Sequence, residues 1–341
     1  MIAQEKVQVH LDHLIEQGYN KDRILGVFLY GSQNYNLDTA ESDVDTHAII
    51  LPSFEEMCLE KNWLSKEYHL PGNEHIVIKD IREYAKQMLK QNINFLEILF
   101  TEYKWVNPKY EELFNTYFIN NRETIARYNM GATVKSVAAQ ALHTFDQFEN
   151  NEDSKKLKKF LFFGEFLNRF YEKELPYEEC LKMDYYARKK CLEFSTADDE
   201  AWDGLILLQN KLKRWNEEAN NLLQIPPNPL AKSMVDEGVV AILKHSFNNL
   251  KTEITYHNFL NKLTNTEERA LAAVARSIGV EGNITISKLV DETHISRPVY
   301  NNLLVKLKEN NVAEINNMGM KGTYIKFTHT VLKAKILEGE L

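Results

Sequence analysis

The residues best suited to chemistry are Gly31 and Ser32, followed after ten intervening residues by Asp43 and Asp45. Successive side chains of a strand point to opposite faces, so Asp43 and Asp45 are expected to share one face and bind a divalent cation there. Carboxylate oxygens suit Mg²⁺ or Mn²⁺, and Mg²⁺ takes further ligands from substrate phosphates. Gly31 permits close backbone approach, and Ser32 offers a hydroxyl and an N–H group to a terminal phosphate at the start of a helix. The four residues predict a site for a metal–triphosphate complex.

Short strands are needed to position these residues. The apolar run 25–30 ends abruptly at Gly31 and predicts a buried strand. A second strand is expected over 43–51, where Pro52 stops it, and a third over 74–79. From residue 80 onwards the periodicity predicts helices over about 81–101, 109–149, 154–173, 177–193, 198–223 and 230–250. We therefore expect an α/β (α+β) fold with a small mixed sheet, followed by a helical bundle.

The segments Gly31-Ser32-Gln-Asn-Tyr35-Asn36-Leu37 and Ser42-Asp43-Val-Asp45 resemble the DNA polymerase β-type nucleotidyltransferase superfamily, in its RlaP-like bacterial and phage branch. A motif of that branch is also similar to Asn92-Ile-Asn94-Phe-Leu-Glu97-Ile-Leu-Phe100. The resemblance covers about residues 20–260. It implies transfer of a nucleoside monophosphate from an NTP to a hydroxyl on RNA, DNA, protein or a small molecule. It also implies that Asp43 and Asp45 are catalytic metal ligands and that Gly31 and Ser32 contact the nucleotide.

The superfamily carries a third carboxylate on the adjacent strand, which here reads Glu74-His-Ile-Val-Ile-Lys79 without an aspartate. Glu74, at the start of this strand, is our candidate for the third catalytic acid. Asp80 is the runner-up, but its position three residues before Glu83 favours a helix N-cap. His75 is a further candidate ligand.

The altered third acid keeps two other functions open beside an active nucleotidyltransferase. One is a DNA-binding regulator whose nucleotidyltransferase domain binds nucleotide without turnover. The other is an enzyme of a toxin–antitoxin or phage-defence system that transfers a nucleoside monophosphate. The cluster Lys155, Lys156, Lys158 and Lys159 is more often a solvated helix face than a binding site for triphosphate or nucleic acid.

The last part of the chain has the order of elements of a winged helix-turn-helix. A helix is expected from Thr266 to about Ser277, then a short helix over 286–292, a four-residue turn, a helix over 297–310 and a hairpin over 312–327. The third helix would enter the major groove of duplex DNA. The residues expected to contact DNA are Ser296, Arg297, Tyr300 and Asn301 at the start of that helix, and Lys321 and Lys326 in the hairpin.

Within this region, Ile286-Ser287-Lys288, Ile295-Ser296-Arg297 and Gly319-Met-Lys-Gly-Thr-Tyr-Ile-Lys326 resemble the DNA-binding domain of the CodY repressors. The resemblance covers about residues 265–330 and implies DNA binding. It does not extend to the effector-sensing domain of CodY, so it implies no sensing of GTP or branched-chain amino acids. A winged helix that serves protein contacts is the alternative.

Composition sets broad limits on these interpretations. The chain has 341 residues, of which 44% are hydrophobic and 26% charged, as in globular proteins. The net charge of −8 argues against indiscriminate binding of polyanions, although residues 264–341 carry 10 basic and 9 acidic residues. Three cysteines without a C-x-x-C pair suggest neither a disulfide framework nor a zinc site. The N-terminus lacks a signal-peptide pattern and no apolar run is long enough to span a membrane, so we expect a cytoplasmic protein.

These patterns predict three domains. Residues 1–105 form the nucleotidyltransferase core, residues 106–260 a helical domain that completes it, and residues 264–341 the winged helix-turn-helix. The polar stretch 258–266 is the expected boundary before the last domain.

Overall fold

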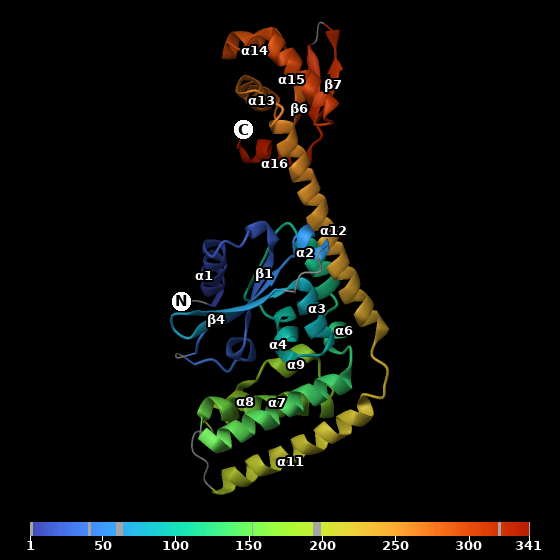
Figure 1. Ribbon diagram of the computed structural model, residues 1–341. Helices are drawn as coiled ribbons and strands as arrows, with labels where there is room; N and C mark the ends of the chain where they lie inside the picture. The colour runs from blue at the N-terminus through green and yellow to red at the C-terminus, as the bar shows by residue number, and fades with distance from the viewer. Residues whose placement is uncertain are drawn as a thin grey trace. The chain divides into compact units, whose positions relative to one another are not determined.

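The computed structural model describes residues 3–39, 42–58, 64–151, 153–193, 199–319 and 322–340. The chain divides into two compact units, residues 1–244 and 245–341, and each is described by itself. The N-terminal unit has a mixed sheet and many helices, and the C-terminal unit has a winged helix-turn-helix (Figure 1). The predicted fold class is therefore confirmed. Among the described helices, none combines the length and apolar composition that a bilayer crossing requires.

A five-stranded sheet lies at the centre of the N-terminal unit, in the order β3-β4-β2-β1-β5. Its central pair, β2 and β4, is parallel, and the other neighbours are antiparallel. The strands are β1 (Ile24–Tyr30), β2 (Asp45–Ile50), β3 (Ser65–Leu70), β4 (Glu74–Asp80) and β5 (Lys104–Val106).

The two faces of this sheet are covered by different helices. Helix α1 (Ala3–Glu16) packs on one face, where Val7, Leu11 and Leu14 join an apolar cluster with alternate residues of the strands. We call this face the α1 face. On the opposite face, His47 of β2 contacts aromatic rings of α3 (Ile81–Leu89) and α4 (Ile93–Leu96). We call it the open face, because the helices cover it at His47, whereas Asp45 at the start of β2 is only half-buried.

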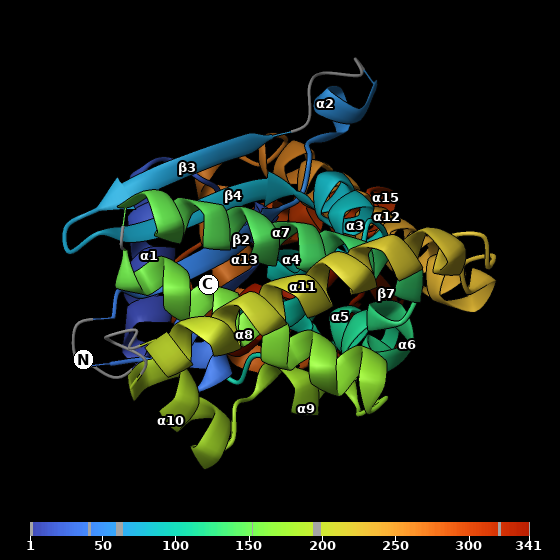
Figure 2. The ribbon, with the colours of Figure 1, turned by 90° about the horizontal axis from the view of Figure 1, so that it is seen from below.

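The remainder of the N-terminal unit is helical, and α7, α8 and α11 lie side by side (Figure 2). The 3₁₀ and π-helical segments are η1 (Lys21–Arg23), η2 (Ser32–Tyr35), η3 (Glu97–Leu99), η4 (Asn115–Ile119) and η5 (Asn168–Glu172). The other helices are α2 (Phe54–Cys58), α5 (Glu111–Phe114), α6 (Arg122–Ala126), α7 (Met130–Asn151), α8 (Ser154–Leu167), α9 (Tyr177–Leu181), α10 (Tyr185–Glu193) and α11 (Asp199–Leu222).

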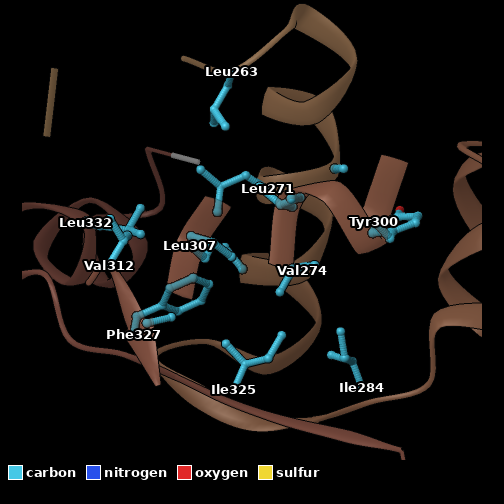
Figure 3. Close-up of a cluster of buried hydrophobic side chains, with 14 of the residues drawn as sticks. Leu263, Leu271, Val274, Ile284, Tyr300, Leu307, Val312, Ile325, Phe327 and Leu332 are labelled. Carbon is cyan, nitrogen blue, oxygen red and sulfur yellow. The ribbon is translucent and has the colours of Figure 1, made fainter. Parts of the chain in front are cut away.

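Helix α12 (Pro229–Leu260) begins in the N-terminal unit and ends in the C-terminal unit. Tyr256 and Phe259, near its end, belong to the core of the C-terminal unit together with Leu263 (Figure 3). The division therefore falls inside a helix at residues 244 and 245, earlier than the polar stretch at which we expected it. The stretch 258–266 is polar overall, but its apolar side chains are buried in the core of the C-terminal unit. The boundary between the units therefore lies before this stretch.

The C-terminal unit has the three-helix and hairpin arrangement that its sequence predicts, with one strand and one helix more. Its elements after α12 are α13 (Asn265–Ile278), β6 (Glu281–Ile284), α14 (Ile286–Thr293), α15 (Arg297–Glu309), β7 (Ala313–Asn317), β8 (Thr323–Phe327) and α16 (Thr330–Glu338). The strands form a sheet in the order β6-β8-β7. Helix α13 begins at Asn265, one residue earlier than predicted, because Thr264 is its N-cap and makes a capping box with Glu267.

Candidate functional site

Asp45 is the first residue of β2, and Asp43 lies two residues before it, so the strand begins later than the predicted residue 43. Val44, between them, is buried in the apolar cluster of the α1 face, so its two neighbours project from the open face. The pKa of the Asp45 carboxyl is raised to about 6. Burial is the larger cause, and the nearby charge of Asp43 is the second. One oxygen of Asp45 accepts a 2.8 Å hydrogen bond from the backbone N–H of His75. Two carboxylates thus share a half-buried position on one face, as their spacing predicts.

Gly31 and Ser32 stand next to these carboxylates, because Tyr30 at the end of β1 pairs directly with Asp45. Gly31 has φ 93° and ψ −151°, a conformation that side chains rarely adopt. A Cβ at this position would meet no atom within 4 Å, so the space beside Gly31 is open. The half-buried Ser32 begins η2, a four-residue 3₁₀ helix rather than a full helix. The phosphate contact predicted for Ser32 therefore depends on its own N–H and hydroxyl, with little help from a helix dipole.

Glu97 stabilises the turn at Gly31 through hydrogen bonds. This fully buried carboxylate accepts hydrogen bonds from the Gly31 N–H at 2.9 Å and from the Tyr35 hydroxyl at 2.7 Å. The side-chain amide of Asn34 donates to it at 3.2 Å. Burial raises the pKa of Glu97 to about 7, and these hydrogen bonds oppose the shift. Glu97 is therefore a positioning residue that fixes the backbone of the Gly31–Ser32 turn.

Glu74 lies on the α1 face, opposite to the face of Asp45. The prediction that it is a third metal-proximal acid beside Asp43 and Asp45 is therefore wrong. Its carboxylate pairs with Lys6 Nζ at 2.6 Å and with His10 Nε2 at 3.2 Å. His10 in turn shares a 2.8 Å hydrogen bond with Thr46, which points away from the face that Asp45 occupies. The physical reason is the alternation of β4: Glu74 points with the buried Ile76 and Ile78, toward the apolar core.

The runner-up, Asp80, is the structural N-cap that its spacing favours. Its side chain accepts a hydrogen bond from the Arg82 N–H at 2.8 Å and pairs with the Arg82 guanidinium at 2.6 Å. Within β4, which is described throughout, the residues on the open face are His75, Val77 and Lys79. The strand position beside Asp45 is therefore held by His75, the further candidate ligand, and β4 supplies no carboxylate there.

All four clustered lysines lie on α8, and Lys159 is the one whose pKa is affected by the charge of Glu97. Tyr35 stacks on Phe162 of α8 with ring centroids 4.0 Å apart, which places this helix behind the Gly31–Ser32 turn. Desolvation lowers the pKa of Lys159, and the charge of Glu97 opposes that shift. Lys159 is thus the member of the cluster that shares the electrostatic environment of Glu97.

The donor set on the open face fits a hard divalent cation. Asp43 and Asp45 offer carboxylate oxygens on one face, and the His75 hydrogen bond occupies only one oxygen of Asp45. Burial and, secondarily, the charge of Asp43 raise the pKa of Asp45, so its ionised form is unfavourable there without positive charge. A bound Mg²⁺ or Mn²⁺ would supply that charge.

The second candidate site is the exposed face of α15 in the C-terminal unit. Arg297 and Asn301 are exposed on it, as predicted, and Val305 and Lys308 continue the same face at helical spacing. Ser296 is the exposed N-cap of this helix. The four exposed side chains form a continuous surface, which we call the α15 face: Arg297, Asn301, Val305 and Lys308.

Tyr300 does not belong to that face, and its predicted contact with DNA is wrong. Its side chain is fully buried in the core of the unit, and its hydroxyl lies 2.8 Å from the Thr293 hydroxyl (Figure 3). The periodic apolar positions Tyr300, Leu303 and Leu307 all point inward, and this periodicity is the signal that predicts burial.

The hairpin that forms the wing places Lys326 at its base. Lys326 is exposed and lies 3.7 Å from Glu281 on the neighbouring strand, so part of its charge is neutralised within the sheet. Lys321, the other lysine predicted to contact DNA, lies outside the described residues. Gly322 directly precedes the returning strand and has φ 93°, and a Cβ there would meet the backbone oxygen of Ile284 at 2.3 Å. The phosphate contacts of both lysines stay predictions.

Comparison with known proteins supports the C-terminal assignment. Residues 280–338 match the family model of the CodY helix-turn-helix domain, which confirms the predicted CodY-like winged helix. A crystal structure described as a nucleotidyltransferase-like protein from Exiguobacterium sibiricum 255-15 aligns with 96% of this chain and 99% of that chain. The two share 9% identity with a TM-score of 0.25, and a likeness this weak carries no argument. The N-terminal site therefore depends on its own residues and geometry.

Proposed function

We propose that the N-terminal unit is a metal-dependent nucleotidyltransferase that moves a nucleoside monophosphate from an NTP to a hydroxyl acceptor. The observation that carries this proposal is the pairing of β1 with β2, which brings the Gly31–Ser32 turn beside Asp43 and Asp45. Phosphate-binding groups and metal-binding carboxylates are then neighbours, as a metal–triphosphate complex requires.

Each residue has a distinct part in this proposal. Asp43 and Asp45 would hold Mg²⁺ or Mn²⁺, which when bound stabilises the charge of the phosphates and of the attacking oxygen. Ser32 would donate its hydroxyl and N–H to a phosphate oxygen. The hydrogen bond from Gly31 to Glu97 fixes the positive-φ conformation of Gly31, so the open space beside that residue would be accessible to the nucleotide. Attack by the acceptor hydroxyl on the α-phosphorus would release pyrophosphate.

The test uses the full chain with each α-labelled NTP, Mg²⁺ or Mn²⁺, and RNA, DNA and protein as acceptors. We expect label on one acceptor with the wild type and none with Asp43→Asn. The matched control is Asp146→Asn, an exposed aspartate of α7, which should transfer like the wild type. Equal transfer by Asp43→Asn and the wild type would contradict the assignment of the metal site.

A second candidate is a regulator whose nucleotidyltransferase unit binds nucleotide without turnover. The observation that favours it is the place of Glu74 on the α1 face, which leaves β4 without a carboxylate beside Asp45. The same assay separates the two functions. NTP binding that depends on Asp43, without transfer to any acceptor class, would support the regulator.

We also propose that the C-terminal unit binds duplex DNA through the α15 face. Arg297 can bond two acceptors of guanine, and Asn301 can bond adenine, from the start of a helix that fits the major groove. Val305 is 53% exposed on the same face and can contact a thymine methyl group. A basic residue at each end, Arg297 and Lys308, favours a polyanionic partner over a protein surface.

Selection of bound fragments from a genomic or random library by the full chain tests the DNA proposal at physiological salt. Arg297→Ala should relax the sequence preference at one position, by about 1–3 kcal/mol for a bidentate base contact. Arg276→Ala removes an exposed arginine from α13 and serves as the control. No enriched motif in the wild type, with binding unaffected by Arg297→Ala, would turn the assignment to protein contacts.

A further inference from the structure

The outer hairpin of the sheet, formed by β3 and β4, carries a cluster of metal-ligating side chains on the open face. Glu67, His69 and His75 each offer one ligand atom, and these atoms all lie within 4.8 Å of one another. His75 Nδ1 lies 3.1 Å from a carboxylate oxygen of Glu67, and the rings of His69 and His75 have centroids 4.5 Å apart. We propose that these three residues form a site for a divalent transition-metal ion such as Zn²⁺, Co²⁺ or Ni²⁺.

The backbone register brings the three side chains to one face. His69 pairs directly with His75 across the antiparallel ladder, and Glu67 lies two residues before His69. Residues two apart on a strand share a face, and directly paired residues share it as well. The intervening Tyr68 points the other way and packs on the core of the α1 face. The ladder thus holds all three ligands before any ion binds.

The ligand types select the class of metal. Two imidazoles and one carboxylate suit Zn²⁺, Co²⁺ and Ni²⁺, whereas Mg²⁺ prefers oxygen ligands alone. Zinc–nitrogen and zinc–oxygen bonds of about 2.1 Å place tetrahedral ligands about 3.4 Å apart, so small side-chain rotations are sufficient. Glu67 and His69 are exposed and His75 is half-buried, so a fourth position is open to water. Three protein ligands with one open position are typical of reactive zinc sites.

This site differs from the proposed Mg²⁺ site but touches it through one residue. The backbone N–H of His75 holds one oxygen of Asp45, while the His75 ring faces Glu67 on the neighbouring strand. An ion that fixes the hairpin would therefore also fix the strand segment that orients Asp45. The proposal does not depend on nucleotidyl transfer, because its ligands come from the hairpin alone.

The experiment is a calorimetric titration of the full chain, freed of metal by a chelator, with Zn²⁺ and separately with Co²⁺. We expect one ion bound per chain, with the visible spectrum of Co²⁺ reporting nitrogen ligands. His75→Ala and His69→Ala should each weaken binding at least tenfold. Glu67→Gln is a milder change on an exposed strand position and should weaken binding while circular dichroism shows the fold intact.

Two controls separate this site from the aspartates. His143→Ala removes an exposed histidine of α7 and should bind like the wild type. Asp43→Asn should retain the transition-metal site even where it abolishes nucleotidyl transfer. The proposal is overturned if the wild type binds no ion, if His69→Ala and His75→Ala bind as tightly as the wild type, or if Asp43→Asn alone abolishes binding.

Discussion

The two faces of the five-stranded sheet treat their acidic residues in opposite ways. On the α1 face, Glu74 pairs with the Lys6 ammonium, is hydrogen-bonded to His10, and is closed off by a helix. On the open face, Asp43 and Asp45 lie close together, and burial raises the pKa of Asp45 to about 6. A paired acid leaves no charge for a cation to neutralise, whereas two neighbouring carboxylates without a cationic partner can bind one. The comparison shows that the surroundings of an acid, more than its position in the sequence, decide which role it has.

The largest expected effect is on transfer, and it should separate the two faces. Asp43→Asn removes a proposed metal ligand and should lower nucleotidyl transfer by about 10²-fold or more, while Glu74→Gln should leave transfer nearly unchanged. Steady-state rates of the two variants on the same acceptor measure the difference. Equal losses from both variants would erase the distinction between the faces.

The next effect is the pH dependence of stability that Glu97 confers on the open face. Burial raises its pKa from 4.5 to about 7, so the folded protein retains a proton that the unfolded chain releases. The free energy of unfolding should therefore fall as pH rises from 4.5 to 7, by an amount on the order of 3 kcal/mol from this group. Glu97→Gln should remove that part of the slope, as urea denaturation at several pH values would show.

The control for this experiment is Glu149→Gln, which changes an exposed glutamate of α7 and should keep the wild-type slope. A wild-type slope in Glu97→Gln would mean that the buried carboxylate is ionised throughout.

A smaller effect concerns stability without added cations, where the two faces should respond with opposite signs. Glu74→Gln leaves Lys6 without its anion and weakens the hydrogen bond to His10, so it should lower the free energy of unfolding by about 1–3 kcal/mol. Asp45→Asn removes a carboxylate that burial and the charge of Asp43 destabilise, and it should raise the free energy of unfolding by about 0.5–2 kcal/mol. Denaturant titration with EDTA present measures both changes. Destabilisation by Asp45→Asn would show that the open face needs no cation.

The smallest effect extends the open face to α8. Lys159→Ala should raise the KM for NTP by about threefold, because the side chain is exposed at its surface and solvent limits the contribution of its charge to about 1 kcal/mol or less. Lys155→Ala changes an exposed lysine of the same helix and is the matched control. Identical KM values for the two variants would remove Lys159 from the nucleotide site.

Much of the fold and half of the site could be predicted from local patterns. The alternation around Val44 places Asp43 and Asp45 on one face, and the pairing of β1 with β2 brings Gly31 to them. The same alternation in β4 places Glu74 with Ile76 and Ile78. The pattern therefore predicts that Glu74 is buried, whereas the family resemblance implies a third catalytic acid on this strand. The spacing of residues within one strand thus predicts which face of the sheet a side chain occupies better than it predicts the function of that side chain.

Other parts of the site could not be predicted because their signals are not local. Strand β3 (Ser65–Leu70) is an exposed edge with little apolar alternation, so its hydrogen bonds to β4 are decided by tertiary pairing. Glu97 was visible only as part of a motif, and its contact with Gly31 joins residues 66 apart. The run 109–149 reads as one helix but contains α5, the π-helix η4, α6 and α7.

The polar chain from Lys6 and His10 through Glu74 and Thr46 also specifies the alignment of the N-terminal helix. An apolar helix on an apolar sheet can slide by one turn, about 5.4 Å, and still bury similar area. Lys6 and His10 are one turn apart, and both must reach Glu74, so a shifted helix would leave a charge unpaired. Glu74 thus fixes the alignment of α1 on the sheet and selects one placement among several of similar hydrophobic burial.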